Sequence, residues 1–240
     1  MRWLRRWNKV AQSDYRGKLF RRCFPLLIVF WVLLVLYPNP LKLSASLARV
    51  ISPEVDPDAV ACLSRSLPSD PAAIESAVEQ TIPYSYDWET YGMPWYCPTV
   101  TEALDKGHGD CKARALVLAS VLEAKDIPYT FMCSPVHMWV DYEGKAETAL
   151  ENDEVKLYQN DPETGERSFR MPKVSVGYVA EMFWQGFWGP MPGARKAFLL
   201  CGLAGLTLLR LSYRKGAHET SGTLHRLALR VWPALGTLRR

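Results

Sequence analysis

The chain has 240 residues, which suits one ordinary domain with additional segments. Apolar residues make up 48% and charged residues 22%, so a disordered, collagen-like or low-complexity chain is excluded. The net charge of +4 divides unevenly, with +7 over residues 1–23, −11 over residues 24–194 and +8 over residues 195–240. An acidic middle excludes nucleic acid as an expected partner, and two basic ends are typical of a membrane protein whose termini stay in the cytoplasm.

Residues 19–37 predict a transmembrane helix. The run 24–37 carries no charge, and Arg21 and Arg22 before it can snorkel to the lipid headgroups. Nineteen residues of helix span about 28 Å, close to the thickness of the hydrocarbon core. A cleaved signal peptide, with small residues at 46–48 as its cleavage site, and a buried core helix are the alternatives. The positive flank orients the residues after this helix away from the cytoplasm.

Segments on both sides of the expected domain have membrane-type patterns. Residues 1–18 place apolar side chains on one helical face among basic ones, which predicts a helix on anionic lipid, with a solvated tail as the alternative. Residues 38–69 are rich in Pro, Ser and Asp and are expected to form a linker. Residues 176–240 are expected to associate with the membrane through an aromatic run at 178–188 and a basic tail. Within them, 197–211 is a candidate second span, with an interfacial, re-entrant or soluble packing helix as alternatives.

Residues 70–175 predict an α+β domain. Residues 111–124 form a strong, buried helix, since they are rich in Ala and Leu and apolar nearly all round. Stretches of β-forming residues follow, and Glu143-Gly144 predicts a hairpin turn. The expected strands are 129–133, 137–142, 146–152, 156–159 and 168–171.

Cys111 and His137 carry the expected chemistry. A cysteine in the first turn of a helix meets the positive end of the helix dipole and free backbone N–H groups, which favour the thiolate. A histidine at the start of a strand packed on that helix can reach the sulfur and form a thiolate–imidazolium pair. The two residues need to be adjacent only in space.

Strand parity provides candidates for a residue that orients His137. A two-residue turn at 143–144 brings Asn152 to the same face as His137, which predicts a Cys-His-Asn set. A three-residue turn favours Glu151 or Asp153 instead. Asp161, in the expected turn of the next hairpin, is the third choice.

The motif GHGDCKARALVLASVLEAKDIPY followed by HMWVDYEGK resembles the transglutaminase-like superfamily, the papain-related cysteine acyltransferases and peptidases. The resemblance covers about residues 70–160. It implies a cysteine-bearing helix packed on an antiparallel sheet and acyl transfer through a thioester, to water or an amine, without a cofactor or metal. A protein or peptide substrate is expected. Trp95 and Tyr96 are candidates for lining the substrate groove, with a packed loop as the alternative. The family pattern usually has Asp as the third residue and Gly where Asp126 stands.

Two other classes of function fit the same residues. A zinc-binding module would use His108, Cys111, Cys133 and His137, whose spacing is typical of zinc ligands. A catalytically inactive membrane scaffold would keep the fold without the chemistry. For the enzyme, the charge pattern predicts a bacterial inner membrane location with the catalytic domain on the periplasmic side.

Overall fold

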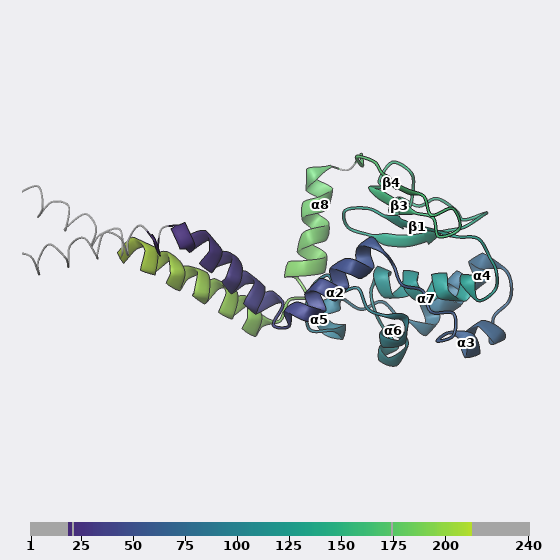
Figure 1. Ribbon diagram of the computed structural model, residues 1–240, viewed down its shortest axis with the longest axis horizontal. Helices are drawn as coiled ribbons and strands as arrows, with labels where there is room; N and C mark the ends of the chain where they lie inside the picture. Colours follow the sequence, from purple (N-terminus) through teal and green to yellow (C-terminus); the bar gives the residue numbers. More distant parts are fainter. Residues whose placement is uncertain (1–18, 21, 174, 213–240) are drawn as a thin grey trace, which may run out of the picture. The chain divides into compact units, whose positions relative to one another are not determined.

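A computed structural model describes residues 19–20, 22–173 and 175–212, and the statements below refer to these residues (Figure 1). The chain divides into two compact units, one formed by Asn39–Pro192 and the other by Met1–Pro38 together with Gly193–Arg240. The expected amphipathic segment 1–18 and most of the basic tail lie outside the described residues.

The larger unit is an α+β fold, as the sequence predicts. Its sheet has the order β2-β1-β3-β4, and every neighbouring pair is antiparallel. Helix α7 (Cys111–Glu123) packs against β2 (Figure 1). The strands are β1 (Thr130–Cys133), β2 (Met138–Asp141), β3 (Tyr158–Asn160) and β4 (Arg167–Phe169).

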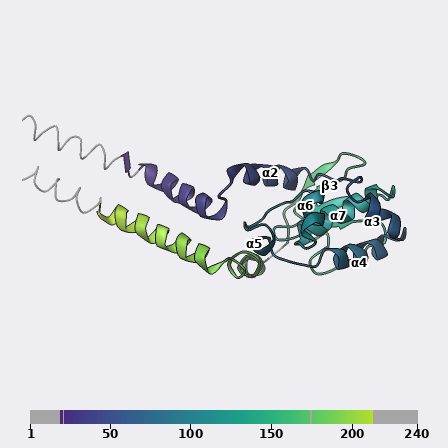
Figure 2. The same cartoon turned by 90° about the horizontal axis from the view of Figure 1, so that it is seen from below.

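The core forms around α7, because nearly every side chain of this helix from Ala113 to Leu122 is buried. Helices α3 (Ala61–Ser66), α4 (Pro71–Thr81) and α6 (Val100–Lys106) lie around it (Figure 2). Local sequence explains where two of these helices begin. Asp70 accepts a hydrogen bond from the backbone N–H of Ala73, and Thr99 forms a reciprocal capping box with Glu102.

The expected linker 38–69 is instead part of the folded unit. Helix α2 (Pro40–Ile51) begins after Asn39, whose side chain caps it, and proline occupies its first position. The hydroxyl of Ser46 on α2 accepts from the backbone N–H of Cys97 at 2.8 Å, and Tyr158 donates to the carbonyl of Ile51 at 3.0 Å. These long-range contacts order a segment whose composition alone suggests a tether.

The expected strand 146–152 does not form. A tight turn follows β2, with Lys145 N–H donating to the carbonyl of Tyr142 and Gly144 at φ 83°. The chain then folds locally, because the Thr148 N–H donates to the carbonyl of Glu151 at 3.0 Å. The following hairpin is confirmed as β3 and β4, and its strands are shifted by one or two residues from the expected ones.

The smaller unit contains two antiparallel helices, Arg22–Leu36 and residues 193–212. Trp31 Nε1 donates to the carbonyl of Leu199 at 3.4 Å, and the Arg195 guanidinium donates to the carbonyl of Val35 at 3.2 Å. A Cβ at Gly202 would overlap the Trp31 ring, so glycine permits this close approach.

No single helix among the described residues combines the length and apolar character needed to cross a bilayer. Among the described residues, only the two consecutive helices Arg22–Leu36 and Pro40–Ile51 meet the requirements of length and composition when they are taken together.

The aromatic run near the end of the larger unit forms helix α8 (Val176–Phe183) and a π-helical turn, η1 (Trp184–Trp188). Ser175 caps α8 by accepting from the backbone N–H of Tyr178.

Candidate active site

Cys111 is the first residue of α7 and is half-buried. Asp110 caps the helix by accepting from the Lys112 N–H at 3.0 Å. Gly109 forms two backbone hydrogen bonds with a neighbouring loop. Its N–H donates to the carbonyl of Pro83 at 3.1 Å, and its carbonyl accepts from the Ser85 N–H at 2.9 Å. A Cβ on Gly109 would lie 2.5 Å from the Cβ of Ala113. Glycine is therefore required for the chain to enter the helix along this path.

His137 is held by the tight connection between β1 and β2. The Ser134 hydroxyl accepts from the His137 N–H at 3.0 Å, and the Ser134 N–H donates to the His137 carbonyl at 2.8 Å. The imidazole stacks on the ring of Trp139, with centroids 5.8 Å apart and planes 13° apart. These contacts fix both the backbone and the ring of His137.

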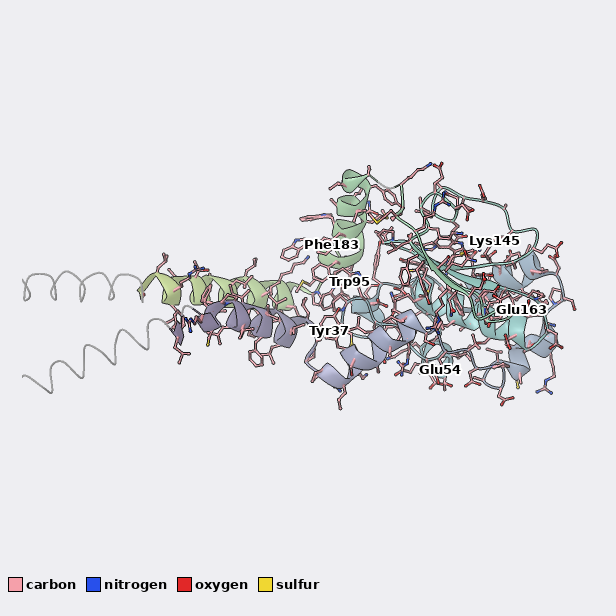
Figure 3. The ribbon with its side chains drawn as sticks, turned by 45° about the horizontal axis from the view of Figure 1, so that its top comes forward. Tyr37, Glu54, Trp95, Lys145, Glu163 and Phe183 are labelled. Atoms are coloured by element: carbon pink, nitrogen blue, oxygen red, sulfur yellow. The ribbon has the colours of Figure 1, made fainter. Side chains whose placement is uncertain are left out.

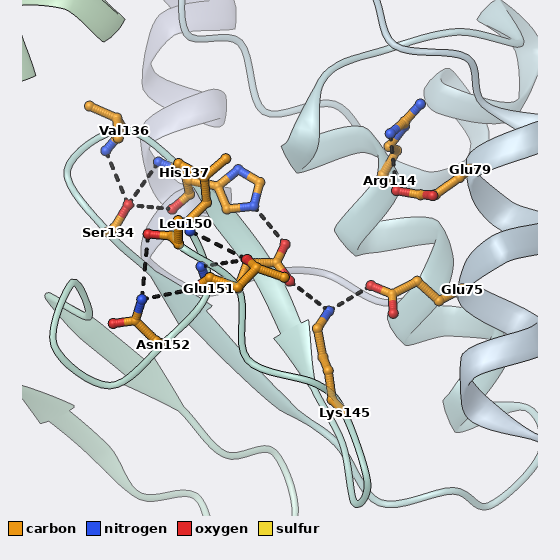
Figure 4. Close-up of polar contacts among 12 residues, drawn as sticks. Glu75, Glu79, Arg114, Ser134, Val136, His137, Lys145, Leu150, Glu151 and Asn152 are labelled. Carbon is orange, nitrogen blue, oxygen red and sulfur yellow. Dashed lines mark hydrogen bonds and ion pairs between the residues drawn. The ribbon is translucent and has the colours of Figure 1, made fainter. Parts of the chain in front are cut away.

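The imidazole of His137 connects Cys111 to Glu151. Its Nε2 lies 2.8 Å from Glu151 Oε1 (Figure 4), and the Cys111 side chain is close enough to the same ring to raise its pKa. Because Nε2 is paired with Glu151, Nδ1 is the nitrogen left for the sulfur. Only about a fifth of each of the His137 and Glu151 side chains is exposed. Cys111, His137 and Glu151 therefore form a partly desolvated triad.

The triad favours the charged imidazole. Burial disfavours the imidazolium, but hydrogen bonds to Cys111 and Glu151 and the negative charges of both groups outweigh this effect and raise the pKa of His137 to about 9. Burial also opposes ionisation of Glu151, but His137 and Lys145 stabilise its carboxylate and hold its pKa below the ordinary value.

A chain of charged groups supports Glu151 from behind. The Lys145 ammonium lies 3.0 Å from Glu151 Oε2 and 2.6 Å from Glu75 Oε1 (Figure 4). The Tyr142 hydroxyl donates to the other Glu75 oxygen at 2.6 Å. Lys145 is nearly buried and Glu75 belongs to α4, so these ion pairs connect the loop that carries Glu151 to a helix of the core. Sequence reasoning missed both residues, because no local pattern relates position 75 to position 145.

The expected third residue, Asn152, is placed elsewhere. Its amide donates to the carbonyl of Thr148 at 2.8 Å, and its carbonyl oxygen accepts from the Glu154 N–H at 2.9 Å. Asn152 would share a face with His137 only in a strand over 146–152, and in a loop two successive side chains need not alternate between faces. Glu151, one of the alternatives predicted from the sequence, makes the contact with His137.

The remaining alternatives are also engaged away from the imidazole. Asp153 is exposed and lies 2.7 Å from the Lys156 ammonium. Asp161 stabilises the turn between β3 and β4, where it accepts from the Thr164 hydroxyl at 2.8 Å.

The two expected groove residues have different environments. Tyr96 is only 2% exposed, and its hydroxyl donates to the Glu102 carboxylate, so its ring faces no open groove. Trp95 is 53% exposed, but its ring stacks on Phe187 of η1, with centroids 4.9 Å apart. The burial of Tyr96 therefore removes it from an open groove, whereas a groove role for Trp95 stays a prediction.

The four residues of the zinc alternative do not converge. His108 Nδ1 lies 3.0 Å from the Thr90 hydroxyl, and His137 is paired with Glu151. Within the described part of the chain, no group of three or more His, Cys, Asp or Glu side chains has the arrangement to hold a metal ion.

A buried ionic cluster lies beside the cysteine. Lys112 forms ion pairs with Asp110 and, at 2.9 Å, with Asp87 of the short helix α5 (Asp87–Thr90), and all three side chains are nearly buried. Burial and the negative charge of Asp110 raise the pKa of Asp87 to about 7, although Lys112 opposes this shift. Lys112 directly follows Cys111 in the sequence, but its partner Asp87 lies 25 positions earlier, so no local pattern predicts this ion pair.

Two other cysteines have environments that suppress ionisation. Burial raises the pKa of the Cys133 thiol to about 11 and that of the Cys97 thiol to about 12. All six cysteines are free.

A polar cavity of about 210 Å³ borders the triad on the Glu151 side. Trp139 and Lys145 are among its lining residues, so it adjoins both the ring that stacks on His137 and the ammonium that pairs with Glu151.

The chain matches no protein-family model, no curated protein and no solved structure.

Proposed function

We propose that this protein is a cysteine-dependent acyl-transfer enzyme that cleaves or transamidates an amide or ester through a Cys111 thioester. The observation that carries the proposal is the position of the His137 ring, which lies 2.8 Å from Glu151 and close enough to Cys111, the first residue of α7, for that side chain to raise the pKa of the ring. A pair of thiolate and imidazolium with a carboxylate behind the imidazole is a known means of activating a sulfur nucleophile.

In this mechanism the Cys111 thiolate attacks the carbonyl carbon, and the carbonyl oxygen becomes an oxyanion. The Cys111 N–H, unpaired within the first turn of α7, is positioned to stabilise that charge. The His137 imidazolium donates its proton to the leaving amine or alcohol, the carbon–heteroatom bond breaks, and a thioester remains. Neutral His137 then takes a proton from water or an acceptor amine as it attacks the thioester, which releases the product and regenerates the thiolate.

Glu151 acts in this scheme as a positioning residue. Its carboxylate accepts from Nε2, which directs Nδ1 toward the sulfur and stabilises the imidazolium. Lys145 fixes the other oxygen of Glu151, so the carboxylate has little freedom to turn away.

Acyl-enzyme trapping tests the proposal. Full-length protein is treated with p-nitrophenyl acetate and analysed by intact-mass spectrometry and peptide mapping, with the Cys111→Ala and Cys62→Ala variants in parallel. Cys62 is an exposed thiol on α3 and serves as the matched control. We expect a single acetyl group on Cys111, retained in Cys62→Ala and lost in Cys111→Ala. Equal acetylation of the two thiols, or none at Cys111 in a folded protein, would support the inactive scaffold instead.

We further propose that the helix pair Arg22–Leu36 and 193–212 anchors the enzyme in a bacterial inner membrane, with the larger unit on the periplasmic side. Large apolar side chains are exposed on both helices, including Leu26, Phe30, Phe198 and Leu208. Such a surface is stable in lipid and costly in water. Reporter fusions after residue 60 should read as periplasmic, and the protein should resist carbonate extraction; a cytoplasmic reading would reverse the orientation.

A further inference from the structure

The larger unit has an exposed aromatic surface formed by Trp95 and by Phe183 of α8, here called the aromatic plate. Phe187 of η1 lies beneath it, stacked on Trp95 at 4.9 Å and on Phe183 at 4.7 Å between ring centroids. Trp95 and Phe183 are themselves 5.7 Å apart, although 88 positions separate them in the chain (Figure 3). The stacking joins a loop before the cysteine helix to the α8–η1 segment as one surface.

Helix α8 lacks the packing that normally stabilises a short helix in water. None of its eight residues is buried, although five of them are Val, Tyr, Met or Phe. Over residues 175–188 the only charged side chain is that of Glu181. A helix this short gains its stability from an apolar face packed against another element. An uncovered segment of this composition therefore requires a partner that accepts apolar and aromatic side chains.

We propose that the aromatic plate docks into the headgroup region of the membrane. The inference rests on the proposed membrane anchor, because η1 ends at Trp188 and only four residues, 189–192, separate it from the apolar helix 193–212. A connection of that length spans at most about 18 Å, so an anchored helix keeps the plate near the bilayer surface. Trp rings in particular prefer this interface, since they combine an apolar body with a polar N–H group.

A series of hydrogen bonds and an ion pair connects the plate to the region of Cys111. Trp95 has φ 47°, a conformation that non-glycine residues rarely adopt, and the Ser46 hydroxyl donates to its carbonyl at 3.2 Å. The next residue, Tyr96, donates its N–H to the Asp87 carboxylate at 2.9 Å, and Asp87 pairs with Lys112 beside Cys111. Docking of Trp95 thus holds the loop that carries Trp95 and Tyr96 at the bilayer, and through Asp87 and Lys112 it keeps Cys111 near the membrane surface. The enzyme therefore acts on acyl groups presented at that surface.

Photocrosslinking in the full-length protein tests the docking. Three single variants carry the photoreactive residue p-benzoylphenylalanine in place of Trp184, Phe30 or Phe169, and each is reconstituted into vesicles of phosphatidylethanolamine and phosphatidylglycerol. Phe30 is 63% exposed on the anchor helix Arg22–Leu36 and reports whether the anchor is in lipid. Phe169 is 77% exposed on β4 and is the matched control, whereas Trp184 is 61% exposed and directly follows Phe183 of the plate. Lipid adducts are detected by mass after irradiation.

We expect lipid adducts at positions 30 and 184, with at least about tenfold less at position 169, a ratio that corresponds to about 1.4 kcal/mol. Adducts at position 30 without adducts at position 184 would overturn the docking while leaving the anchor intact. Adducts at position 184 to a second copy of the chain would also overturn it and identify the plate as a dimer surface. Absence of adducts at all three positions would refute the anchor, and the docking with it.

Discussion

Replacement of Glu151 by Gln removes a negative charge next to His137 with little change of shape. The amide oxygen can still accept from Nε2, so the ring keeps its orientation while the imidazolium loses a counter-ion. The pKa of His137, about 9 in the native protein, must therefore fall. A hydrogen bond to a charged group is worth about 1.5 kcal/mol, and one pKa unit corresponds to about 1.4 kcal/mol. The expected decrease is therefore about one unit.

The sign of this change is visible in the pH dependence of kcat/KM. Acylation requires the imidazolium, so the native enzyme should lose activity as the pH rises through about 9. In Glu151→Gln this basic limb should move about one unit toward neutral pH, in line with the change derived above. The maximal rate should also fall by about two to four orders of magnitude, as expected when an orienting carboxylate is neutralised.

The assay follows hydrolysis of an activated ester or amide over the pH range, with thermal unfolding measured for each variant. Asn152→Ala is the matched control, because Asn152 is adjacent in sequence and its amide bonds only to the local backbone. It should leave the basic limb unchanged. A basic limb that stays near pH 9 in Glu151→Gln would refute the electrostatic role, and a greater loss in Asn152→Ala would return the orienting role to Asn152.

Three further changes probe the packing around the site and between the helices. Lys112→Met leaves Asp87 and Asp110 buried without their cation, so it should cost about 3–5 kcal/mol in urea unfolding. The loss should be smaller at about pH 5 than at about pH 8, because unpaired buried carboxyls have raised pKa values and regain protons as the pH falls; an equal loss at both would contradict the ionic account. Leu116→Ala creates a cavity in the fully buried face of α7 and should cost about 2–5 kcal/mol by the same measurement, whereas a cost below about 1 kcal/mol would show that the site relaxes. Gly202→Leu should separate the two helices of the smaller unit, because its side chain would occupy the space of the Trp31 ring. Reduced crosslinking between cysteines introduced on the two helices would report that separation, and unchanged crosslinking would contradict the packing.

Local sequence determined the elements that carry Cys111 and His137. A segment rich in Ala and Leu and apolar nearly all round predicted a buried helix from position 111, and this is α7. Stretches of β-forming residues and a turn signal predicted the strands that became β1 and β2 and the hairpin of β3 and β4. Turns and side-chain periodicity depend on the backbone of neighbouring residues, so these signals act over only a few residues. They can therefore be recognised in the sequence before the tertiary structure is known.

Tertiary structure decided which carboxylate meets the histidine. Glu151 lies in a loop whose path is fixed by the ion pair of Lys145 with Glu75, two residues 70 positions apart. The burial of Lys112 with Asp87 and the stacking of Trp95 on Phe187 likewise join distant segments. The energy of such contacts is gained only after the intervening chain has folded, so no pattern within one segment encodes them. Strand parity could choose among Glu151, Asn152 and Asp153 only if residues 146–152 formed a strand. They form a loop instead, in which a local hydrogen bond of Thr148 to Glu151 combines with the contacts of Glu151 to His137 and Lys145.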